Sequence, residues 1–348
     1  MNCKKIALIN GSLCGGGAER FTANFANAIE KDSIYNLFLI TAEKKEDEYE
    51  LVKGIKRFCI LSESFIKDLY TIRKFLIKNK INTAIGIGIY ANLLLCSINF
   101  FLKTTIIISE RNDPKHDNLS IISKVLRKLL YWRSDKYVFQ TEGAKSFYSN
   151  SIQKRSVVIH NPVKENLPIK STLCKKEIIA VGRLMPQKNY PLLINAFTQV
   201  SKHYPDYILR IFGKGLLLNE LKVMADKLGI SNKVIFEGFC TNIHEEIKDS
   251  DIFVLSSDFE GMPNSLMEAM AMGFPVISTD CPSGGPSELI TNGVNGLLVK
   301  TDDVKSLSNA ILTLINNEEF KQKIANSAKH LRATHSMDFI ISKWKDIL

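Results

Sequence analysis

The sequence has few features of a disulfide or metal scaffold. Its seven cysteines are scattered, with no Cys-x-x-Cys pair and no histidine at a metal-ligand spacing. An odd number of dispersed cysteines predicts reduced thiols. The opening residues, MNCKKIALI, join two lysines to a short apolar run without a small-residue cleavage site. No secretory signal is indicated, and we expect a cytoplasmic protein.

A convincing membrane span is also missing, although one segment imitates it. Residues 81–102 have the length that a helix needs to cross a bilayer, but they contain three asparagines and two glycines. A buried strand over 83–89 followed by a helix over 91–102 explains them without placing amides in lipid. No motif interleaves aromatic and basic residues, so nucleic acid is not an expected partner.

The positive charge is unevenly placed. Residues 1–163 carry 25 Lys and Arg against 15 Asp and Glu, whereas residues 164–348 carry 21 of each kind, so the net charge of +10 arises in the first half. In its densest segment, Lys124, Arg127 and Lys128 are predicted on one face of an amphipathic helix. This helix is either an ordinary surface helix or a docking surface for anionic lipid or a polyanionic acceptor.

Strand and helix patterns alternate along the chain in two series, separated by a polar, proline-containing stretch after residue 163. The expected strands are 5–9, 35–41, 83–89, 104–109, 136–140, 156–159, 177–181, 207–212, 234–237, 252–255 and 275–278. This alternation predicts an α/β protein with two Rossmann-like, doubly wound parallel-sheet domains. Ligands of such sheets bind at the carboxyl ends of the strands, which we expect to face each other across a cleft.

A glycine-rich turn follows the first strand. Gly15, Gly16 and Gly17 open a helix there, which lets backbone amides approach an anion at the positive end of the helix dipole. The turn lacks the G-x-G-x-x-G register and the later acidic residue of a dinucleotide site, which argues against NAD. It is either a phosphate or substrate contact or a plain strand-to-helix turn.

Two loops of the second series carry more specific chemistry. After the strand at 177–181, Gly182 lets the backbone lie close to a ligand, and Arg183 and Lys188 can reach a diphosphate from two sides. Further on, Glu260 follows a strand, and Glu268 lies about one turn into the next helix. The amides at the start of that helix suit a diphosphate, and a carboxylate within it can accept hydrogen bonds from a ribose diol.

Together these segments resemble glycosyltransferase family 4, a family of retaining enzymes with the two-domain GT-B fold. The resemblance covers nearly the whole chain. It is carried by GGGAER at 15–20, SERNDP at 109–114, HNPV at 160–163, GRLMPQKN at 182–189, FEGMPNSLMEAMAMGFPVI at 259–277 and CPSGGPSELI at 281–290. It implies an acceptor-binding domain over 1–163, a nucleotide-sugar-binding domain over 164–335 and a helix over 336–348 that crosses back to the first domain.

The resemblance also implies roles for residues. Arg183 and Lys188 would hold the donor diphosphate and steady the leaving group, and Glu260 would contact the transferred sugar; these are the expected catalytic residues. Glu268 would bind the ribose. The other expected donor contacts are Gly15, Gly16, Gly182, Gly261, Met262, Pro263, Asn264, Ser265 and Leu266. Retention through departure and attack on one face is implied, with neither metal nor cofactor.

One position departs from the family pattern. Many relatives carry a histidine where Arg111 stands, and a guanidinium cannot accept a proton or a hydrogen bond. If that histidine binds the 6-hydroxyl of the sugar, Arg111 or Glu110 must recognise it differently. Together with Gly17, these two residues are the expected acceptor or sugar contacts.

The combined expectation is a hexosyltransferase of bacterial surface polysaccharide synthesis, of lipopolysaccharide or capsule type. It would move a hexose or N-acetylhexosamine from a UDP-sugar to a glycan or an undecaprenyl-linked glycan. It would be cytoplasmic, with peripheral contact to the anionic inner face of the plasma membrane. Two alternatives stay open: a UDP-sugar epimerase-like enzyme of the same fold, and a non-catalytic GT-B protein that binds lipid through its basic half.

Overall fold

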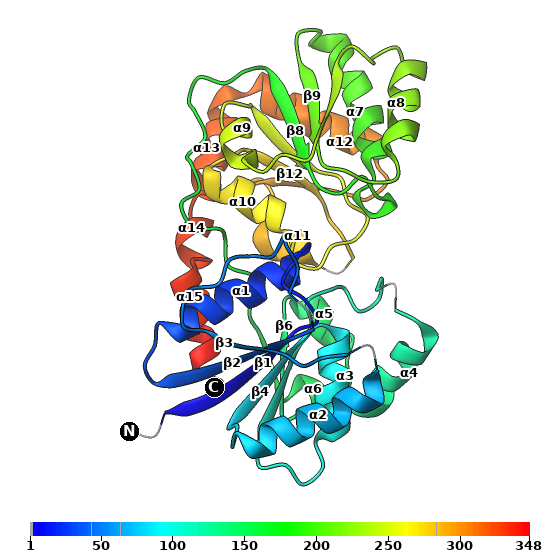
Figure 1. Cartoon of the computed structure of the whole chain (residues 1–348). Helices are drawn as coiled ribbons and strands as arrows, with labels where there is room; N and C mark the ends of the chain where they lie inside the picture. The colour runs from blue at the N-terminus through cyan, green and yellow to red at the C-terminus, as the bar shows by residue number, and fades with distance from the viewer. Residues whose placement is uncertain (1–2, 43, 63, 118, 283) are drawn as a thin grey trace. The chain divides into compact units, whose positions relative to one another are not determined.

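The computed structural model describes residues 3–42, 44–62, 64–117, 119–282 and 284–348. The chain divides into two compact units: residues 1–162 join residues 337–348 in the first, and residues 163–336 form the second. Each boundary lies one residue from its sequence-based position. Each unit is a parallel sheet with helices on both faces, which confirms the predicted α/β class and its two Rossmann-like sheets (Figure 1).

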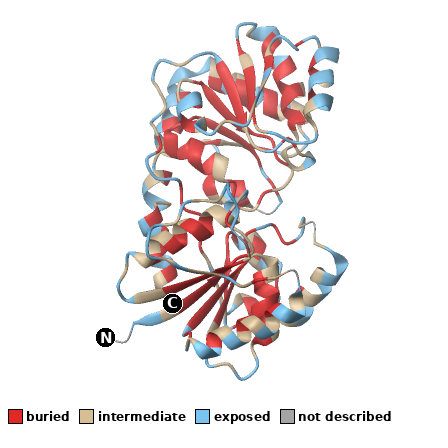
Figure 2. Cartoon of the chain, viewed as in Figure 1, coloured by how far each residue is buried: buried red, intermediate tan, exposed pale blue. Residues whose placement is uncertain are grey.

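In the described part of the first unit, seven parallel strands lie in the order β3-β2-β1-β4-β5-β6-β7. They are β1 (Lys4–Ile9), β2 (Tyr35–Thr41), β3 (Lys56–Cys59), β4 (Thr83–Ile87), β5 (Thr105–Ser109), β6 (Lys136–Phe139) and β7 (Ser156–Val158). The central strands are almost continuously apolar because helices cover both of their faces, and Figure 2 shows them as buried.

The helices of the first unit form two layers. They are α1 (Gly17–Glu30), α2 (Phe65–Lys78), α3 (Ile89–Ile98), α4 (Ile121–Leu130), the 3-10 turn η1 (Tyr131–Arg133), α5 (Glu142–Ser146), α6 (Asn150–Gln153) and α15 (Met337–Lys345). α1 and α15 share one core cluster, in which Trp344 is fully buried against the rings of Phe21 and Phe25. α2, α3 and α5 contribute to the cluster on the other face of the sheet.

In the described part of the second unit, six parallel strands lie in the order β10-β9-β8-β11-β12-β13. They are β8 (Glu177–Val181), β9 (Ile208–Phe212), β10 (Val234–Gly238), β11 (Ile252–Leu255), β12 (Val276–Thr279) and β13 (Leu297–Val299). The helices are η2 (Pro186–Lys188), α7 (Tyr190–His203), α8 (Leu218–Lys227), α9 (Ile243–Ile247), α10 (Asn264–Met272), α11 (Gly285–Leu289), α12 (Val304–Asn316), α13 (Glu318–Ala328) and α14 (Leu331–Thr334).

The apolar segment 81–102 forms strand β4 and helix α3, as the sequence predicted, although α3 ends at Ile98. None of the helices in the described residues combines the length and the apolar character needed to cross a bilayer. No expected element corresponds to β3, α2 or β13. β3 and β13 have only four and three residues, and β3 is a half-exposed edge strand without clear alternation.

The predicted basic helix is α4, and one of its three cations is buried. Lys124 and Lys128 are exposed, whereas Arg127 is buried, pairs with Asp117 and donates to the carbonyl of Pro114 at 3.1 Å. Nζ of Lys124 also lies 3.6 Å from Asp117, so the three cations do lie on one face of α4, as predicted. The spacing did not indicate that Arg127 would be buried while its neighbours stay exposed.

Candidate functional site

The carboxyl ends of β8 and β11 meet where the strand order of the second sheet reverses. β8 has β9 on one side and β11 on the other, so the chain leaves β8 and β11 toward different helices. In open α/β sheets such a switch point leaves room for a ligand between the two departing loops. These loops, residues 182–189 and 256–263, carry the charged residues that the sequence analysis singled out.

Lys188 and Glu260 form an ion pair between the two loops. Nζ of Lys188 lies 2.5 Å from Oε1 of Glu260, and the hydroxyl of Ser257 donates to the same oxygen at 2.7 Å. Both charged side chains are largely buried, so salt screens their attraction little. The Gln187 amide donates to the carbonyl of Phe259 at 2.9 Å and ties the loops together again. A positive charge and a carboxylate are thus fixed side by side.

Glycines permit this arrangement by letting backbones touch. A Cβ on Gly182 would lie 2.9 Å from Cε of Lys188, and one on Gly213 would lie 1.9 Å from the carbonyl oxygen of Gly182. On the other side, a Cβ on Gly285 would lie 1.7 Å from the carbonyl oxygen of Gly261. Both loops are therefore held by contacts that only glycine allows.

Helix α10 begins beside the ion pair without a side-chain cap. Its first backbone hydrogen bond from residue i to i−4 joins the amide of Met267 to the carbonyl of Pro263 at 3.1 Å. The amides of Ser265 and Leu266 precede this bond, at the positive end of the helix dipole. The side chains of Met262 and Leu266 belong to the hydrophobic core, so these residues can offer a ligand only their backbone.

Glu268 is held within α10 by a residue that the sequence analysis missed. Its Oε2 lies 2.9 Å from Nε2 of His244 on α9, and both side chains are buried. A buried carboxylate is costly unless it is hydrogen-bonded, and His244 supplies such a partner. No local pattern could have indicated His244, because it comes from a different helix and stands 24 residues away in sequence.

Arg183 is exposed at the start of the loop after β8. Within the described residues no ion pair engages it, unlike Lys188. Its guanidinium is available to an anion that arrives from solvent.

The glycine turn of the first unit leads into α1. Gly15 has a φ of +100°, Gly16 caps the helix without a side-chain hydrogen bond, and both are exposed together with Gly17. The carboxylate of Glu19 lies at this helix start, because a Cβ on Gly16 would be 2.5 Å from its Oε2. A carboxylate repels a phosphate, so the turn suits sugar or acceptor hydroxyls better than the donor diphosphate.

Glu110 follows β5 and turns into the interior of the first unit. It accepts hydrogen bonds from the hydroxyls of Tyr131 and Tyr148, each at 3.2 Å. Burial raises the pKa of its carboxyl, despite the nearby Arg127. In this position Glu110 links β5 to η1 and to the segment after α5, and its expected contact with sugar or acceptor stays a prediction.

Arg111 is buried beside it with unused donors. Its guanidinium lies 3.7 Å from the ring centroid of Phe21, and Nη2 donates to Asn161. Nε and Nη1 have no hydrogen-bond partner among the described residues. Burial lowers the pKa of Arg111 to about 9, so the group stays protonated at neutral pH. A buried cation with two unused donors is costly, which marks Arg111 as suited to a polar or anionic ligand.

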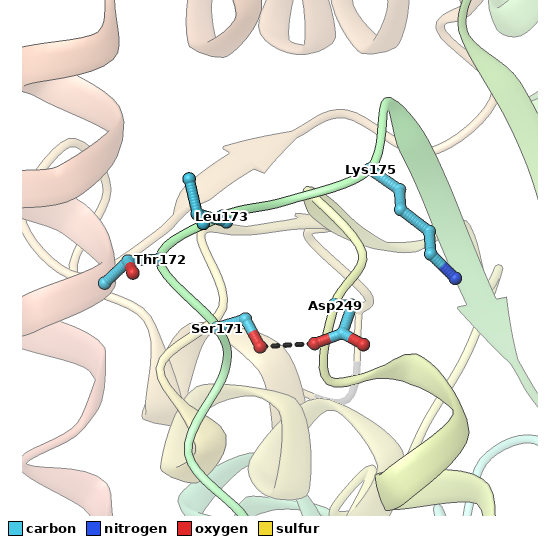
Figure 3. A pocket seen from close by; sticks show the side chains of 5 residues that line it. All are labelled: Ser171, Thr172, Leu173, Lys175 and Asp249. Carbon is cyan, nitrogen blue, oxygen red and sulfur yellow. Dashed lines mark hydrogen bonds between the residues drawn. The ribbon is translucent and has the colours of Figure 1, made fainter.

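The sequence contains one Asp-x-Asp pair, Asp249 and Asp251. Two such carboxylates could bind a divalent cation, so their positions bear on the expectation that no metal is needed. Asp251 is buried, pairs with Lys321 at 3.0 Å and accepts from the hydroxyl of Tyr207 at 2.7 Å. Asp249 instead accepts from Ser171 beside a shallow hollow of about 450 Å³ (Figure 3). The hollow shares no residue with the loops after β8 and β11; it is lined by Ser171, Thr172, Leu173, Lys175 and Asp249.

Among the residues that the structure describes, no three His, Cys, Asp or Glu side chains are grouped so that they could hold a metal ion. The two carboxylates of the Asp-x-Asp pair have separate partners, so the pair is not assembled as a metal site. That the reaction proceeds without a metal stays a prediction.

The chain is similar to known glycosyltransferases. Residues 163–331 match the family described as Glycosyl transferases group 1. The chain is 28% identical over 347 residues to an uncharacterized glycosyltransferase of Haemophilus influenzae, with 96% of each chain covered. It is 27% identical to the GalNAc-alpha-(1->4)-GalNAc-alpha-(1->3)-diNAcBac-PP-undecaprenol alpha-1,4-N-acetyl-D-galactosaminyltransferase of Campylobacter jejuni, over 99% of this chain and 98% of that one.

Among solved structures, HepE of Anabaena in complex with UDP superposes with a TM-score of 0.84 at 18% identity, over 99% of each chain. The two sheets and these similarities define the class of protein: it is a glycosyltransferase with the GT-B fold. The match to the glycosyl transferases group 1 model spans nearly all of the second unit. The alternative of a non-catalytic binding protein is therefore set aside.

Proposed function

We propose that the protein is a retaining, family 4 hexosyltransferase. It moves a hexose or N-acetylhexosamine from a UDP-sugar to a glycan or an undecaprenyl-linked glycan during bacterial surface polysaccharide synthesis. The observation that carries this proposal is the Lys188–Glu260 ion pair at the start of α10, one helical turn before the buried Glu268. Cation, helix amides and carboxylates together match the parts of a nucleoside diphosphate sugar.

Each group has a distinct role in the proposed reaction. Lys188, Arg183 and the amides at the start of α10 bind the diphosphate, and Glu268 accepts hydrogen bonds from the ribose. As the bond between the anomeric carbon and the phosphate oxygen breaks, the electron pair leaves with UDP. The cations and the helix dipole stabilise this negative charge because they are already in place.

The acceptor hydroxyl attacks the anomeric carbon on the face from which UDP departs, and its proton passes to the departing phosphate oxygen. Glu260, fixed by Ser257 and Lys188, contacts the transferred sugar. No step needs a metal or a cofactor, so turnover is expected to persist in EDTA. Loss of turnover in EDTA that is restored by a divalent cation would contradict this.

In the first unit, the turn Gly15–Gly17 contacts the sugar or acceptor, and Arg111 binds a polar group of either. The undecaprenol in the name of the Campylobacter relative and the UDP in the Anabaena structure support a lipid-linked acceptor and a uridine donor. A lipid-linked acceptor and the basic first half support a cytoplasmic enzyme that contacts the inner face of the plasma membrane.

Thermal-shift titration with UDP, GDP and ADP tests the donor site. Stabilisation by UDP alone is expected, and Lys188→Ala and Glu268→Ala should each weaken it. Lys222→Ala and Glu220→Ala, on α8, are matched controls that should respond like the wild type. A folded protein that none of the three diphosphates stabilises would count against the proposal.

Product analysis tests the reaction itself. With a UDP-sugar and an undecaprenyl-linked glycan, NMR is expected to show a new linkage with the anomeric configuration of the donor. An inverted linkage would rule out retention. A changed sugar nucleotide formed without any acceptor would instead favour the epimerase-like alternative.

A further inference from the structure

The outward face of α4 and η1 is unusually apolar. Five side chains on it are between 50% and 82% exposed: Ile121, Ile122, Val125, Leu129 and Trp132. At about 100° per residue these positions form one continuous stripe along the helix, about 100° wide. We name these five side chains the α4 stripe. Figure 2 shows α4 as largely exposed.

The orientation of α4 is the reverse of that of an ordinary surface helix. Such a helix turns its apolar stripe to the core and its charges to water. Here only Leu126 and Leu130 pack against the core, partly buried, while Arg127 is buried in its ion pair with Asp117. The larger apolar face is left exposed.

The charges around the stripe indicate the chemistry of its partner. The segment 121–133 contains four cations and no carboxylate. Asp117 pairs with Arg127 and also lies 3.6 Å from Nζ of Lys124, so α4 carries three cations against this one carboxylate and a net positive charge remains. Lys124 and Lys128 are exposed along one edge of the stripe. Apolar side chains flanked by lysines fit a bilayer that presents negative headgroups over hydrocarbon.

A tryptophan at the end of the stripe is prepared for an apolar environment. The indole Nε1 of Trp132 donates to the carbonyl of Leu129 at 2.8 Å. Its one polar group is therefore already satisfied by the backbone, so the ring can enter the interface of a bilayer without losing a hydrogen bond to water.

The apolar surface continues onto the loop between α3 and β5. Asn99 donates to the carbonyl of Arg133 at 2.6 Å, and the Arg133 guanidinium lies 3.5 Å from the ring centroid of Phe100, which ties the loop to η1. The next residue, Phe101, is fully exposed and has a φ of +53°. A bulky residue rarely adopts this conformation, and here it presents its ring to the outside.

We propose that the α4 stripe, with Phe100 and Phe101, docks the protein onto an anionic phospholipid bilayer. This inference rests on the proposed function, because a lipid-linked acceptor lies in such a bilayer. A second copy of the chain fits the surface less well. A two-fold contact through the stripe would bring Lys124 and Lys128 of one copy close to the same lysines of the other.

Co-sedimentation of the full chain with vesicles tests the proposal. Binding is expected to vesicles of phosphatidylcholine with phosphatidylglycerol, to be much weaker to phosphatidylcholine alone, and to fall as salt rises. The double change Lys124→Gln and Lys128→Gln should weaken partition by about 30-fold, since each removes one cation near the surface. Leu129→Gln with Trp132→Gln should abolish it.

Matched controls separate a specific surface from exposed apolar residues in general. Leu216→Gln with Val223→Gln changes two similarly exposed side chains of the second unit and should leave vesicle binding unchanged. The proposal would be overturned if the wild-type protein did not bind anionic vesicles. It would also be overturned if the Leu129 and Trp132 variant lost no more binding than the Leu216 and Val223 variant. A dimer in light scattering that the Leu129 and Trp132 changes break would overturn it as well, because the stripe would then bind a second copy.

The UDP titration, run on the same samples, distinguishes the two proposals. Stabilisation by UDP without vesicle binding refutes the docking surface alone. Vesicle binding without stabilisation by any nucleoside diphosphate refutes the proposed function and leaves the docking surface standing. The same titration also shows that each variant is folded.

Discussion

The two sheets have the same kind of switch point and equip it differently. In the second unit, the loops after β8 and β11 hold Lys188 and Glu260 as a partner-satisfied pair. In the first, the turn after β1 is exposed, and the nearby buried cation, Arg111, keeps two donors without a partner among the described residues. The second unit therefore holds a cation whose partner is present, and the first holds a buried cation with unused donors. Removing Lys188 should lower the free energy of unfolding, whereas removing Arg111 should leave it unchanged or raise it.

The largest expected effect comes from the backbone contacts of the second unit. Gly213→Ala would place a Cβ 1.9 Å from a backbone oxygen, at a residue with a φ of +144°. It should lower the free energy of unfolding by about 4 kcal/mol or prevent folding. Gly11→Ala, in the loop after β1, meets nothing within 4 Å and should cost less than about 1 kcal/mol. Urea denaturation measures the free energy of unfolding of both variants. Equal losses would contradict the difference expected between the two glycines.

The second largest effect is expected when Lys188, the paired cation, is removed. Lys188→Ala should lower kcat by about 100-fold to 1000-fold, because a group that stabilises the leaving charge is lost. It should also lower the free energy of unfolding by about 3 kcal/mol, since Glu260 is left buried without its cation.

The double change Lys188→Met and Glu260→Gln is the control for this effect. It should bring the stability back to within about 1 kcal/mol of the wild type without restoring activity. Steady-state kinetics and urea denaturation measure the two properties. If activity returned together with stability, the ion pair would be structural only.

A smaller effect is expected for the residue behind Glu268. His244→Ala should raise the KM for the donor about tenfold, as expected for a lost charge-assisted hydrogen bond, with a smaller change in kcat. His244→Gln keeps a donor and should recover part of the affinity. His203→Ala, exposed at the end of α7, is the matched control. A lower kcat at unchanged KM would argue against a positioning role.

The smallest change in stability is expected when Arg111 is replaced. Arg111→Met should leave the free energy of unfolding within about 1 kcal/mol of the wild type, or raise it, because an incompletely satisfied buried charge disappears. Activity should nonetheless fall about tenfold if Arg111 binds a polar group of the substrate. A strongly destabilised variant would show instead that Arg111 has a structural role, through its stacking on Phe21.

The fold was predictable because buried parallel strands leave continuous apolar runs between helical patterns. The loops that bring Lys188 and Glu260 together were predictable as well, since each follows a strand and the carboxyl ends of parallel strands lie along one edge of their sheet. For Glu260 and Glu268, the helix start between them fixed their relation within a single element.

Other features depend on contacts that no local pattern encodes. The partner of Glu268 comes from α9, and the orientation of Glu110 depends on two tyrosines that are far along the chain. α4 shows a further limit. Its amphipathic pattern was visible in the sequence, but the buried side includes Arg127, paired with Asp117, and the larger apolar stripe is exposed.

The return of the chain to the first unit has a consequence for biosynthesis. The first sheet is covered on one side by α15, whose Trp344 fills the space beside Phe21 and Phe25. On the ribosome, residues 163–336 are complete before this helix emerges. Phe21 and Phe25, which are translated early, therefore lack the cover of Trp344 until α15 has been translated.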